Sequence, residues 1–167
     1  MEKKEKHTAT IGVYGIPQDM EGRGLWSKRF DGKGINAIGG TVDPEDAQNA
    51  RALFEVLKRE FREEAGVEIE LVEERPLGVF TMVNLQDIAV LFNVRIISGE
   101  PTPSPEATEH IWMDPSQIAE AAKRYDEGDK ANGLLSGKGK RQWRMAKAFF
   151  VYASQNTEFR KRALSEM

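Results

Sequence analysis

The sequence predicts one domain of the α/β class (α+β), in which strands and helices are mixed, and three observations predict it. Its 167 residues with 40% hydrophobic content can form one sizeable core and leave little length for a second. Apolar runs of strand length recur along the chain. One long segment between them has the 3.6-residue periodicity of a helix. We therefore expect a single domain over residues 1–167.

Strands separated by glycine-rich turns are expected in the first part of the chain, after a flexible charged tail over residues 1–7. Residues 35–38 form an apolar run that stops at Gly39-Gly40, where two glycines let the backbone turn tightly or approach a ligand closely. The earlier strands are expected at residues 8–17 and around residues 25–30.

A long helix is expected next. Asp43 is a suitable N-cap, and Pro44 fits the first helical position. The apolar side chains that follow lie on one stripe, and Gly66 is a good C-terminal cap. We therefore expect one helix from Asp43 to Ala65.

Beyond Gly66 the pattern returns to strands. Residues 88–97 are almost continuously apolar, so we expect this strand in the centre of a sheet. Asp114-Pro115 repeats the cap-and-proline signal and should open a helix that runs to about Asp126. The other expected elements are a strand at residues 68–83, a proline-rich loop at 99–106, a short strand at 111–113 and a C-terminal helical segment over 141–165, with the helix itself from Arg141 to about Gln155.

Three carboxylates near the end of the long helix are the strongest functional signal. At about 100° per residue, Glu60, Glu63 and Glu64 fall within roughly a third of the helix circumference and can converge on one point. They lie at the margin of the apolar stripe, where carboxylates are costly without a partner. A solvated acidic face paired with Arg59 and Arg62 fits this placement poorly. A hard divalent cation, Mg²⁺ or Mn²⁺, takes oxygen ligands and is the expected partner.

Composition narrows the chemistry and the location. With no cysteine and only two histidines, His7 and His110, the chain has no thiolate zinc site, no cysteine nucleophile and no multi-histidine site. The net charge of −3 gives no global attraction to nucleic acid. The sequence has no apolar run of about 18 residues and no apolar N-terminal stretch, so we expect a cytoplasmic protein without a membrane segment.

The string from Arg59 to Val67 resembles the second half of the Nudix hydrolase signature, Gly-x5-Glu-x7-Arg-Glu-U-x-Glu-Glu-x-Gly-U, with Phe61 at the aliphatic position U. In the first half, Asp46 follows Gly40 by six residues, and Glu45 follows Gly39 by six. Twelve residues separate Asp46 from Arg59 where the family has seven. A wholly helical insertion of five residues would add about 7.5 Å and about 140° of rotation, so we expect the first acid to be displaced from the metal site.

The resemblance extends over residues 8–125. Residues 25–29 are similar to a family strand that ends in a basic residue, and residues 109–115 are similar to an acid-x-x-Trp strand that leads into a helix. The resemblance implies the Nudix α/β/α sandwich, with a mixed β-sheet between helices. It also implies a divalent-metal-dependent hydrolase that cleaves the pyrophosphate bond of a nucleoside diphosphate linked to another moiety.

By the match, Glu60, Glu63 and Glu64 would be metal ligands, together with the Gly40 carbonyl. Arg59 would pair with a glutamate, Glu63 being one turn away, and hold it in position. The resemblance thus places Glu60, Glu63 and Arg59 among the catalytic residues, and Glu60 is the first choice for the general base.

Other residues complete the expected site. Glu106 and Glu109 are alternatives for the base, and Lys28 and Arg29 would bind the substrate phosphates. The subfamily marks of ADP-ribose, dinucleoside-polyphosphate, coenzyme A and NADH hydrolases are absent, so a nucleoside triphosphate or a nucleotide sugar is the default substrate. The partner is a small-molecule nucleotide, and a homodimer is possible.

Two alternatives remain open. The altered spacing before Arg59 is compatible with a nucleotide-binding module that does not cleave its ligand. Basic residues around Trp143 are compatible with RNA binding or RNA cap hydrolysis, although an amphipathic helix with a solvated basic side is the preferred explanation. Those residues are Lys138, Lys140, Arg141, Arg144 and Lys147.

Overall fold

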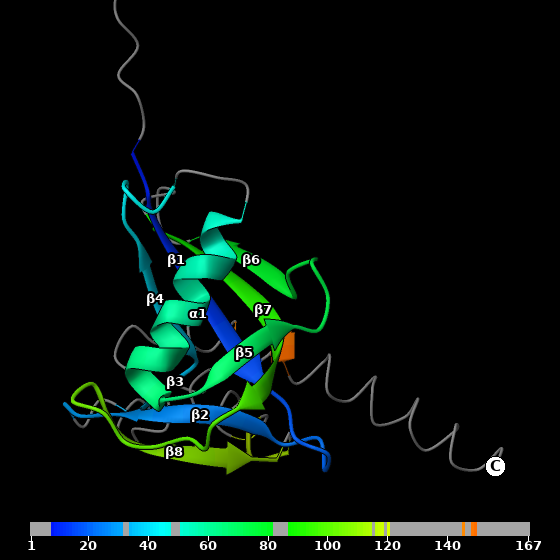
Figure 1. The fold of residues 1–167 in the computed structure, drawn as a ribbon. Coiled ribbons are helices and arrows are strands. Elements are labelled where there is room, and N and C mark those ends of the chain that lie inside the picture. Colours follow the sequence, from blue (N-terminus) through cyan, green and yellow to red (C-terminus); the bar gives the residue numbers. More distant parts are fainter. Residues whose placement is uncertain are drawn as a thin grey trace, which may run out of the picture.

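The computed structural model describes residues 8–31, 34–47, 51–81, 87–114, 116–118, 120, 145 and 148–149. Within them, strands form two sheets, and one long helix, α1, lies against the larger sheet (Figure 1). The elements are β1 (Thr10–Pro17), β2 (Gly24–Arg29), β3 (Ile35–Asn36), β4 (Ile38–Val42), α1 (Ala52–Ala65), β5 (Glu68–Leu71), β6 (Gly78–Thr81), β7 (Asp87–Ser98) and β8 (Ala107–Met113).

The larger sheet is mixed and has β7 at its centre, as the sequence predicts. Its order is β4-β1-β7-β5, and β6 also pairs with β7. The β1–β7 pair is parallel, whereas β4, β5 and β6 pair antiparallel with their neighbours. The smaller sheet, β3-β2-β8, is antiparallel and lies across the end of the larger one (Figure 1).

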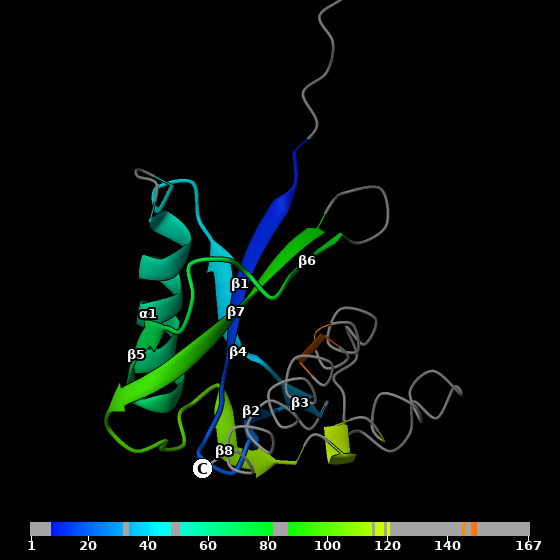
Figure 2. The same ribbon diagram turned by 90° about the vertical axis from the view of Figure 1, so that its right-hand side faces the viewer.

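Two apolar clusters cover the two faces of the larger sheet. One joins α1 to the sheet and includes Leu57, Phe61 and Val13. The other includes Tyr14 and Trp26 and is covered by helical residues at 116–118 and 148–149. Figure 2 shows α1 on one side of the sheet and these short described helical stretches on the other. The sheet therefore lies between helices, as the expected α/β/α sandwich requires.

The long helix begins later than the sequence predicts. Asp43 and Pro44 start a turn instead, closed by the Asp46 N–H to the Asp43 carbonyl and the Ala47 N–H to the Pro44 carbonyl. The Asp46 carboxylate also accepts the Asp43 N–H. Helix α1 starts only at Ala52 and has no side-chain cap. At its other end it stops as expected at Gly66, whose left-handed conformation (φ 70°) ends the helical bonding.

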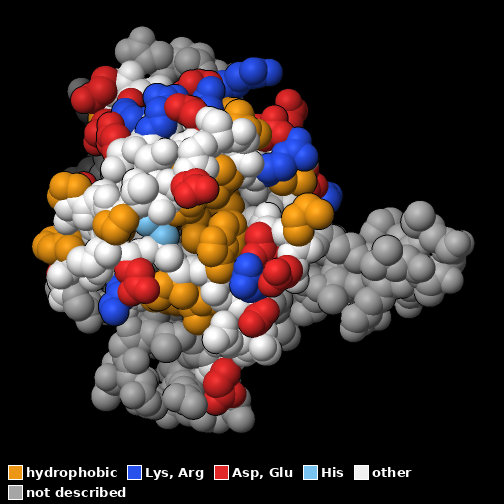
Figure 3. Space-filling view, turned by 60° about the horizontal axis from the view of Figure 1, so that its bottom comes forward, with side chains coloured by type: hydrophobic (Ala, Val, Ile, Leu, Met, Phe, Trp, Pro, Cys, Tyr) orange, Lys and Arg blue, Asp and Glu red, His pale blue; other side chains and the backbone are white. Residues whose placement is uncertain are grey.

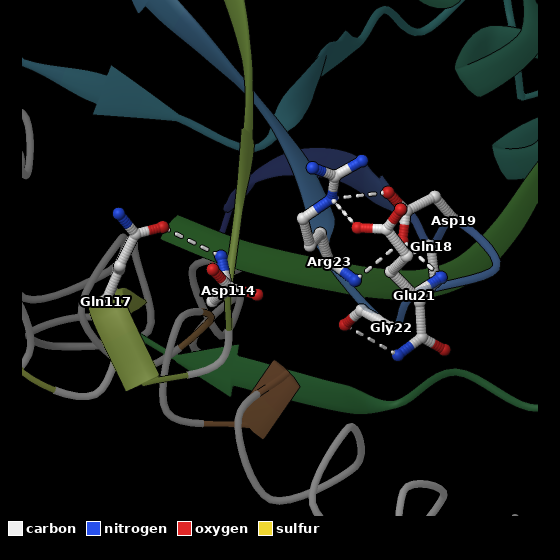
Figure 4. Close-up of polar contacts among 7 residues, drawn as sticks. All are labelled: Gln18, Asp19, Glu21, Gly22, Arg23, Asp114 and Gln117. Carbon is white, nitrogen blue, oxygen red and sulfur yellow. Dashed lines mark hydrogen bonds and ion pairs between the residues drawn. The ribbon is translucent and has the colours of Figure 1, made fainter.

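The same signal at Asp114 does open a helix. The side-chain oxygen of Gln117, three residues on, accepts the Asp114 N–H (Figure 4). The backbone N–H groups of Gln117 and Ile118 donate to the Asp114 carbonyl. Residues 116–118 and 120 are helical. The rest of this expected helix lies outside the described residues.

Two further expectations need correction. Gly39-Gly40 do not stop a strand but lie inside β4, paired with Tyr14 and Val13 of β1. The expected strand at residues 68–83 is two strands, β5 and β6, because both pair with successive parts of the longer β7 and the intervening residues cross between them.

Some sequence predictions concern residues outside the described part. These are the flexible tail at 1–7 and most of the helical segment at 141–165, of which residues 145, 148 and 149 are helical. The single domain over residues 1–167 stays a prediction. No helix among the described residues is both long and apolar enough to cross a membrane.

Candidate functional site

Helix α1 brings two of its glutamates against the backbone of β4. A Cβ atom at Gly40 would lie 2.5 Å from the Glu60 carboxyl group, so a side chain there would displace that carboxylate. A Cβ atom at Gly39, whose φ is 147°, would lie 2.1 Å from the Val13 carbonyl oxygen. The backbone N–H of Gly39 also donates to the Glu64 carboxylate. Gly40 therefore leaves room for the Glu60 carboxylate, and Gly39 leaves room for the backbone of β1.

The glutamates are crowded and partly removed from water. Burial raises the pKa of Glu64 to about 8, and the nearby charges of Glu60 and Glu106 add to this effect. The Gly39 N–H and the Arg29 guanidinium oppose it only in part. Burial also raises the pKa of Glu60, and the charges of Glu63 and Glu106 act in the same direction. Four acids thus influence one another here: Glu60, Glu63, Glu64 and Glu106.

Arg59 connects this cluster to the turn before the helix. Its guanidinium nitrogens lie 2.9 and 3.3 Å from the two carboxylate oxygens of Asp46, and a longer contact of 3.5 Å reaches Glu60. A glutamate partner was expected, with Glu63 one turn away. The glutamate that Arg59 contacts is Glu60, and its shorter contacts are to Asp46. Asp46, expected to be displaced by the insertion, pairs with Arg59 because residues 43–47 form a turn and α1 begins only at Ala52. The Arg59 hydrogen bonds lower the pKa of Asp46.

The two basic residues at the end of β2 have different surroundings. Arg29 is 33% exposed, forms an ion pair with Asp31 at 2.6 Å, and lies near the charges of Glu64 and Glu106. Lys28 is 53% exposed and lies 3.7 Å from Glu109 across the β2–β8 pair. A β-bulge between them changes the strand register. Of this pair, only Arg29 lies near the glutamate cluster in the described structure.

The two acids expected as alternatives for the general base, Glu106 and Glu109, have different neighbours. Glu106 acts electrostatically on both Glu60 and Glu64. Its carbonyl accepts the N–H of Phe30, which ties the loop before β8 to the end of β2. Glu109 faces Lys28 instead. Glu106 therefore lies beside the cluster, and Glu109 lies in a surface ion pair.

One group of residues at the end of α1 was not predicted from the sequence. His110, Ser27 and Thr102 form hydrogen bonds that reach the backbone of Glu64 and Ala65. The sequence carries no spacing signal for them, because they come from two strands and a loop. Only the register of β2 against β8, which pairs Ser27 with His110, brings them together.

The oxygen-rich donor set fits a hard divalent cation. The side chains that approach β4 are carboxylates, and their raised pKa values reflect mutual repulsion and burial that a cation would relieve. Within the part of the chain that the structure describes, no three histidine, cysteine or acidic side chains lie close enough to hold a metal ion.

Comparisons with known proteins agree with this fold. The family model described as NUDIX domain matches residues 7–132. A sequence comparison with curated proteins gave no match.

Several solved structures resemble this chain. An ADP-ribose pyrophosphatase from Streptococcus suis 89-1591 shares 21% identity over 65% of this chain and 76% of that one, with a TM-score of 0.53. A MutT protein from Methanosarcina mazei Go1 shares 22% over 70% and 85%, with a TM-score of 0.54. A NUDIX hydrolase from Nitrosomonas europaea shares 13% over 84% and 90%, with a TM-score of 0.58. At these identities the likeness concerns the fold, and it confirms the expected fold class.

The burial of Glu64 predicts an unusual pH dependence for the metal-free protein. The unfolded chain releases this proton near its ordinary pKa of 4.5, whereas the folded protein keeps it up to about 8. The contribution of Glu64 to the free energy of unfolding should therefore be highest below about pH 4.5. It should fall by an amount on the order of a few kcal/mol as the pH rises toward 8. Urea unfolding in EDTA at pH 5 and at pH 8 measures this change in the free energy of unfolding.

The matched variant is Glu64→Gln, which has no charge to lose. Its stability should change much less between the two pH values than that of the wild type. A wild-type protein that is equally stable at pH 5 and pH 8, or more stable at pH 8, would contradict the burial of Glu64.

A second prediction concerns the pair that bridges the insertion. Asp46→Asn and Arg59→Gln should each lower the melting temperature, and the double variant should lose less than the sum, because either single change already breaks the pair. The coupling should shrink as salt is raised, since both side chains are partly exposed. Glu45→Gln, the acid in the other register, is the control and should show no coupling to Arg59. Coupling of Glu45 in place of Asp46 would refute this arrangement.

Proposed function

This chain belongs to the NUDIX domain family, and from that premise we propose that it cleaves the pyrophosphate bond of a nucleoside diphosphate linked to another moiety, with Mg²⁺ or Mn²⁺. The family match confirms the resemblance drawn from residues 59–67 and, with it, the expected class of enzyme, a Nudix hydrolase. The metal dependence, the substrate and the role of each residue are part of the proposal.

One observation carries the proposal: Glu64 is largely buried beside Glu60 and Glu106 and against the backbone of Gly39. Such a cluster opposes folding unless a cation joins it, so its retention is better explained by function than by stability. Glu60, Glu63 and Glu64, with the Gly40 carbonyl, would hold the metal. When bound, that metal would neutralise phosphate charge and lower the pKa of bound water.

The chain's own residues supply the remaining chemistry. A water oxygen attacks phosphorus while the bond from phosphorus to the bridging oxygen breaks, and a carboxylate accepts the proton that the water releases. Glu60 remains the first choice for this base. Glu106 is a better alternative than Glu109, because Glu106 lies near Glu60 and Glu64. Arg29 would bind substrate phosphate through its guanidinium. Arg59, held by Asp46, would keep Glu60 in position.

The substrate is proposed from what the sequence lacks. Because no subfamily mark is present, a nucleoside triphosphate or a nucleotide sugar is the default. The related structures include an ADP-ribose pyrophosphatase and a MutT protein, and their activities enter only as substrates to test. A small-molecule nucleotide as partner, a possible homodimer and a cytoplasmic location stay predictions. The basic residues that suggested RNA lie outside the described residues, and no structural observation favours that alternative or a non-hydrolytic module.

Chromatographic separation of the phosphorylated products over a substrate panel tests the proposal. A nucleoside triphosphate would give pyrophosphate or phosphate, whereas a nucleotide sugar or ADP-ribose would give a nucleoside monophosphate and a sugar phosphate. The panel contains nucleoside triphosphates, nucleotide sugars, ADP-ribose and dinucleoside polyphosphates, each with Mg²⁺, with Mn²⁺ and with EDTA. At least one substrate should be cleaved only with metal. Glu64→Gln should lower kcat/KM by about 100-fold or more, because losing a metal ligand removes several kcal/mol of transition-state stabilisation. Metal-dependent release that is unchanged in the variant would sink the site assignment.

A non-hydrolytic module gives a different result. The folded wild-type protein would then bind nucleotide, by calorimetry or fluorescence, yet release nothing from any member of the panel. That outcome would overturn the proposed hydrolysis and favour the alternative module.

The alternatives for the base are separated by a matched pair of variants. If Glu106 takes the proton, Glu106→Gln should lower kcat by about 100-fold or more and alter the acidic limb of the pH–rate profile. Glu109→Gln, which removes only the Lys28 ion pair, should stay within about threefold. Small effects from both, together with a large loss in Glu60→Gln, would leave Glu60 as the base. A large loss in Glu109→Gln alone would contradict the separation of the two acids.

A further inference from the structure

Three segments of the chain meet at the ring of His110. Ser27 of β2 and His110 of β8 face each other across the antiparallel pair, and the Ser27 hydroxyl lies 2.9 Å from His110 Nδ1. The other ring nitrogen, Nε2, lies 3.0 Å from the carbonyl oxygen of Glu64 and 3.0 Å from that of Thr102. One side chain thus links the smaller sheet, the end of α1 and the loop before β8.

These contacts fix the tautomer of the neutral ring. Both partners of Nε2 are carbonyl oxygens, which only accept, so Nε2 carries the proton and donates. Nδ1 is then an acceptor, and it accepts the hydrogen bond of the Ser27 hydroxyl. Ser27 is almost fully buried, so this bond is protected from water. Ser27 therefore orients the ring through Nδ1, so that Nε2 can donate to the Glu64 carbonyl.

The end of α1 needs this donor. The last carbonyl groups of a helix have no partner within it. The N–H of Gly66 donates to the Arg62 carbonyl, the N–H of Thr102 donates to the Ala65 carbonyl at 3.0 Å, and His110 serves the Glu64 carbonyl between them. A Cβ atom at Gly66 would lie 2.8 Å from the Thr102 hydroxyl oxygen, so the loop packs closely on this helix end.

Glu64 is consequently held at two points. His110 binds its backbone carbonyl, and the Gly39 N–H binds its side-chain carboxylate. Movement of the backbone at this helix end would move the carboxylate relative to β4. The surface near this end of the molecule, seen in Figure 3, exposes a histidine beside hydrophobic side chains, with acidic and basic groups around them.

We propose that His110 is a positioning residue for the metal site, which holds the Glu64 backbone so that its carboxylate stays in place to bind the divalent cation. The inference rests on the proposed function. His110 contacts the helix backbone and takes no part in the reaction itself. Residues that orient a metal ligand from behind commonly change metal affinity by 10–100-fold when they are replaced.

The experiment compares His110→Ala with His110→Gln in the full-length protein. A glutamine amide nitrogen can reach about the position of Nε2 and donate to the Glu64 carbonyl, whereas alanine cannot. Thr108→Ala, an exposed position on the same strand, is the control. Three quantities are measured: the Mg²⁺ dissociation constant by calorimetry without substrate, the Mg²⁺ concentration for half-maximal turnover, and the melting temperature in EDTA.

His110→Ala should raise the Mg²⁺ dissociation constant by about 10-fold or more, and His110→Gln should restore it to within about threefold of the wild type. Thr108→Ala should not change it. Ser27→Ala, which frees the ring, should raise it severalfold and serves where His110→Ala does not fold. A lower melting temperature with unchanged Mg²⁺ affinity in the folded variants would assign His110 a structural role only and overturn the inference.

The ring tautomer gives a readout that does not depend on metal or activity. The nitrogen NMR shifts of the metal-free protein should show His110 protonated at Nε2, and its signals are identified by their loss in His110→Gln because His7 is the one other histidine. Protonation at Nδ1 instead would overturn the inference. A wild-type protein that neither binds Mg²⁺ nor hydrolyses any substrate would overturn the proposed function and this inference with it. Metal-dependent turnover with unchanged affinity in His110→Ala would overturn the inference alone.

Discussion

The close approach of α1 to β4 is the constraint on which the site depends. Phe61 is fully buried between the helix and the sheet, and a Cβ atom at Gly15 would already lie 3.0 Å from its ring. Glu60, directly before Phe61, and Glu64, three residues after it, face Gly40 and Gly39 of β4, where there is no room for a side chain. Apolar burial on one side of the helix thus forces carboxylates on its margin into contact with backbone. The same packing that stabilises the fold creates the acidic cluster.

That cluster is expensive, and the surrounding groups offset only part of its cost. The Gly39 N–H and Arg29 favour the ionised Glu64, yet burial and the neighbouring acids outweigh them, and its pKa stays near 8. Against the effect of burial, Arg59 acts to lower the pKa of Glu60, but it also forms an ion pair with Asp46, so its charge is shared between two carboxylates. A divalent cation would supply the missing positive charge at the point where the side chains crowd, which is why stability and metal binding should be coupled in this protein.

Local signals in the sequence predicted the elements better than their ends. The apolar run at residues 88–97 identified the central strand, and Gly66 identified the end of α1. The predicted start of α1 at Asp43 was wrong, although Asp43 and Asp114 carry the same cap-and-proline signal. At Asp114 the side chain of Gln117 accepts the Asp114 N–H. At Asp43 the Asp46 carboxylate makes the same contact but also binds Arg59 across the turn. That competition is tertiary and has no trace in a local pattern. The link between Ser27 and His110 depends likewise on strand register.

The insertion shows what the spacing in the signature has to preserve. Twelve residues instead of seven lie between Asp46 and Arg59, and a continuous helix of that length would have carried the acid away. The chain instead forms a turn at residues 43–47 and starts α1 at Ala52, so Asp46 returns to the Arg59 guanidinium. The requirement is therefore a contact, not a count of residues: any connection that brings an acid back to Arg59 leaves the glutamates after it on the same face of α1. In this chain the longer spacing is accommodated before α1 starts at Ala52, whereas helical geometry sets the relative positions of residues 59–65.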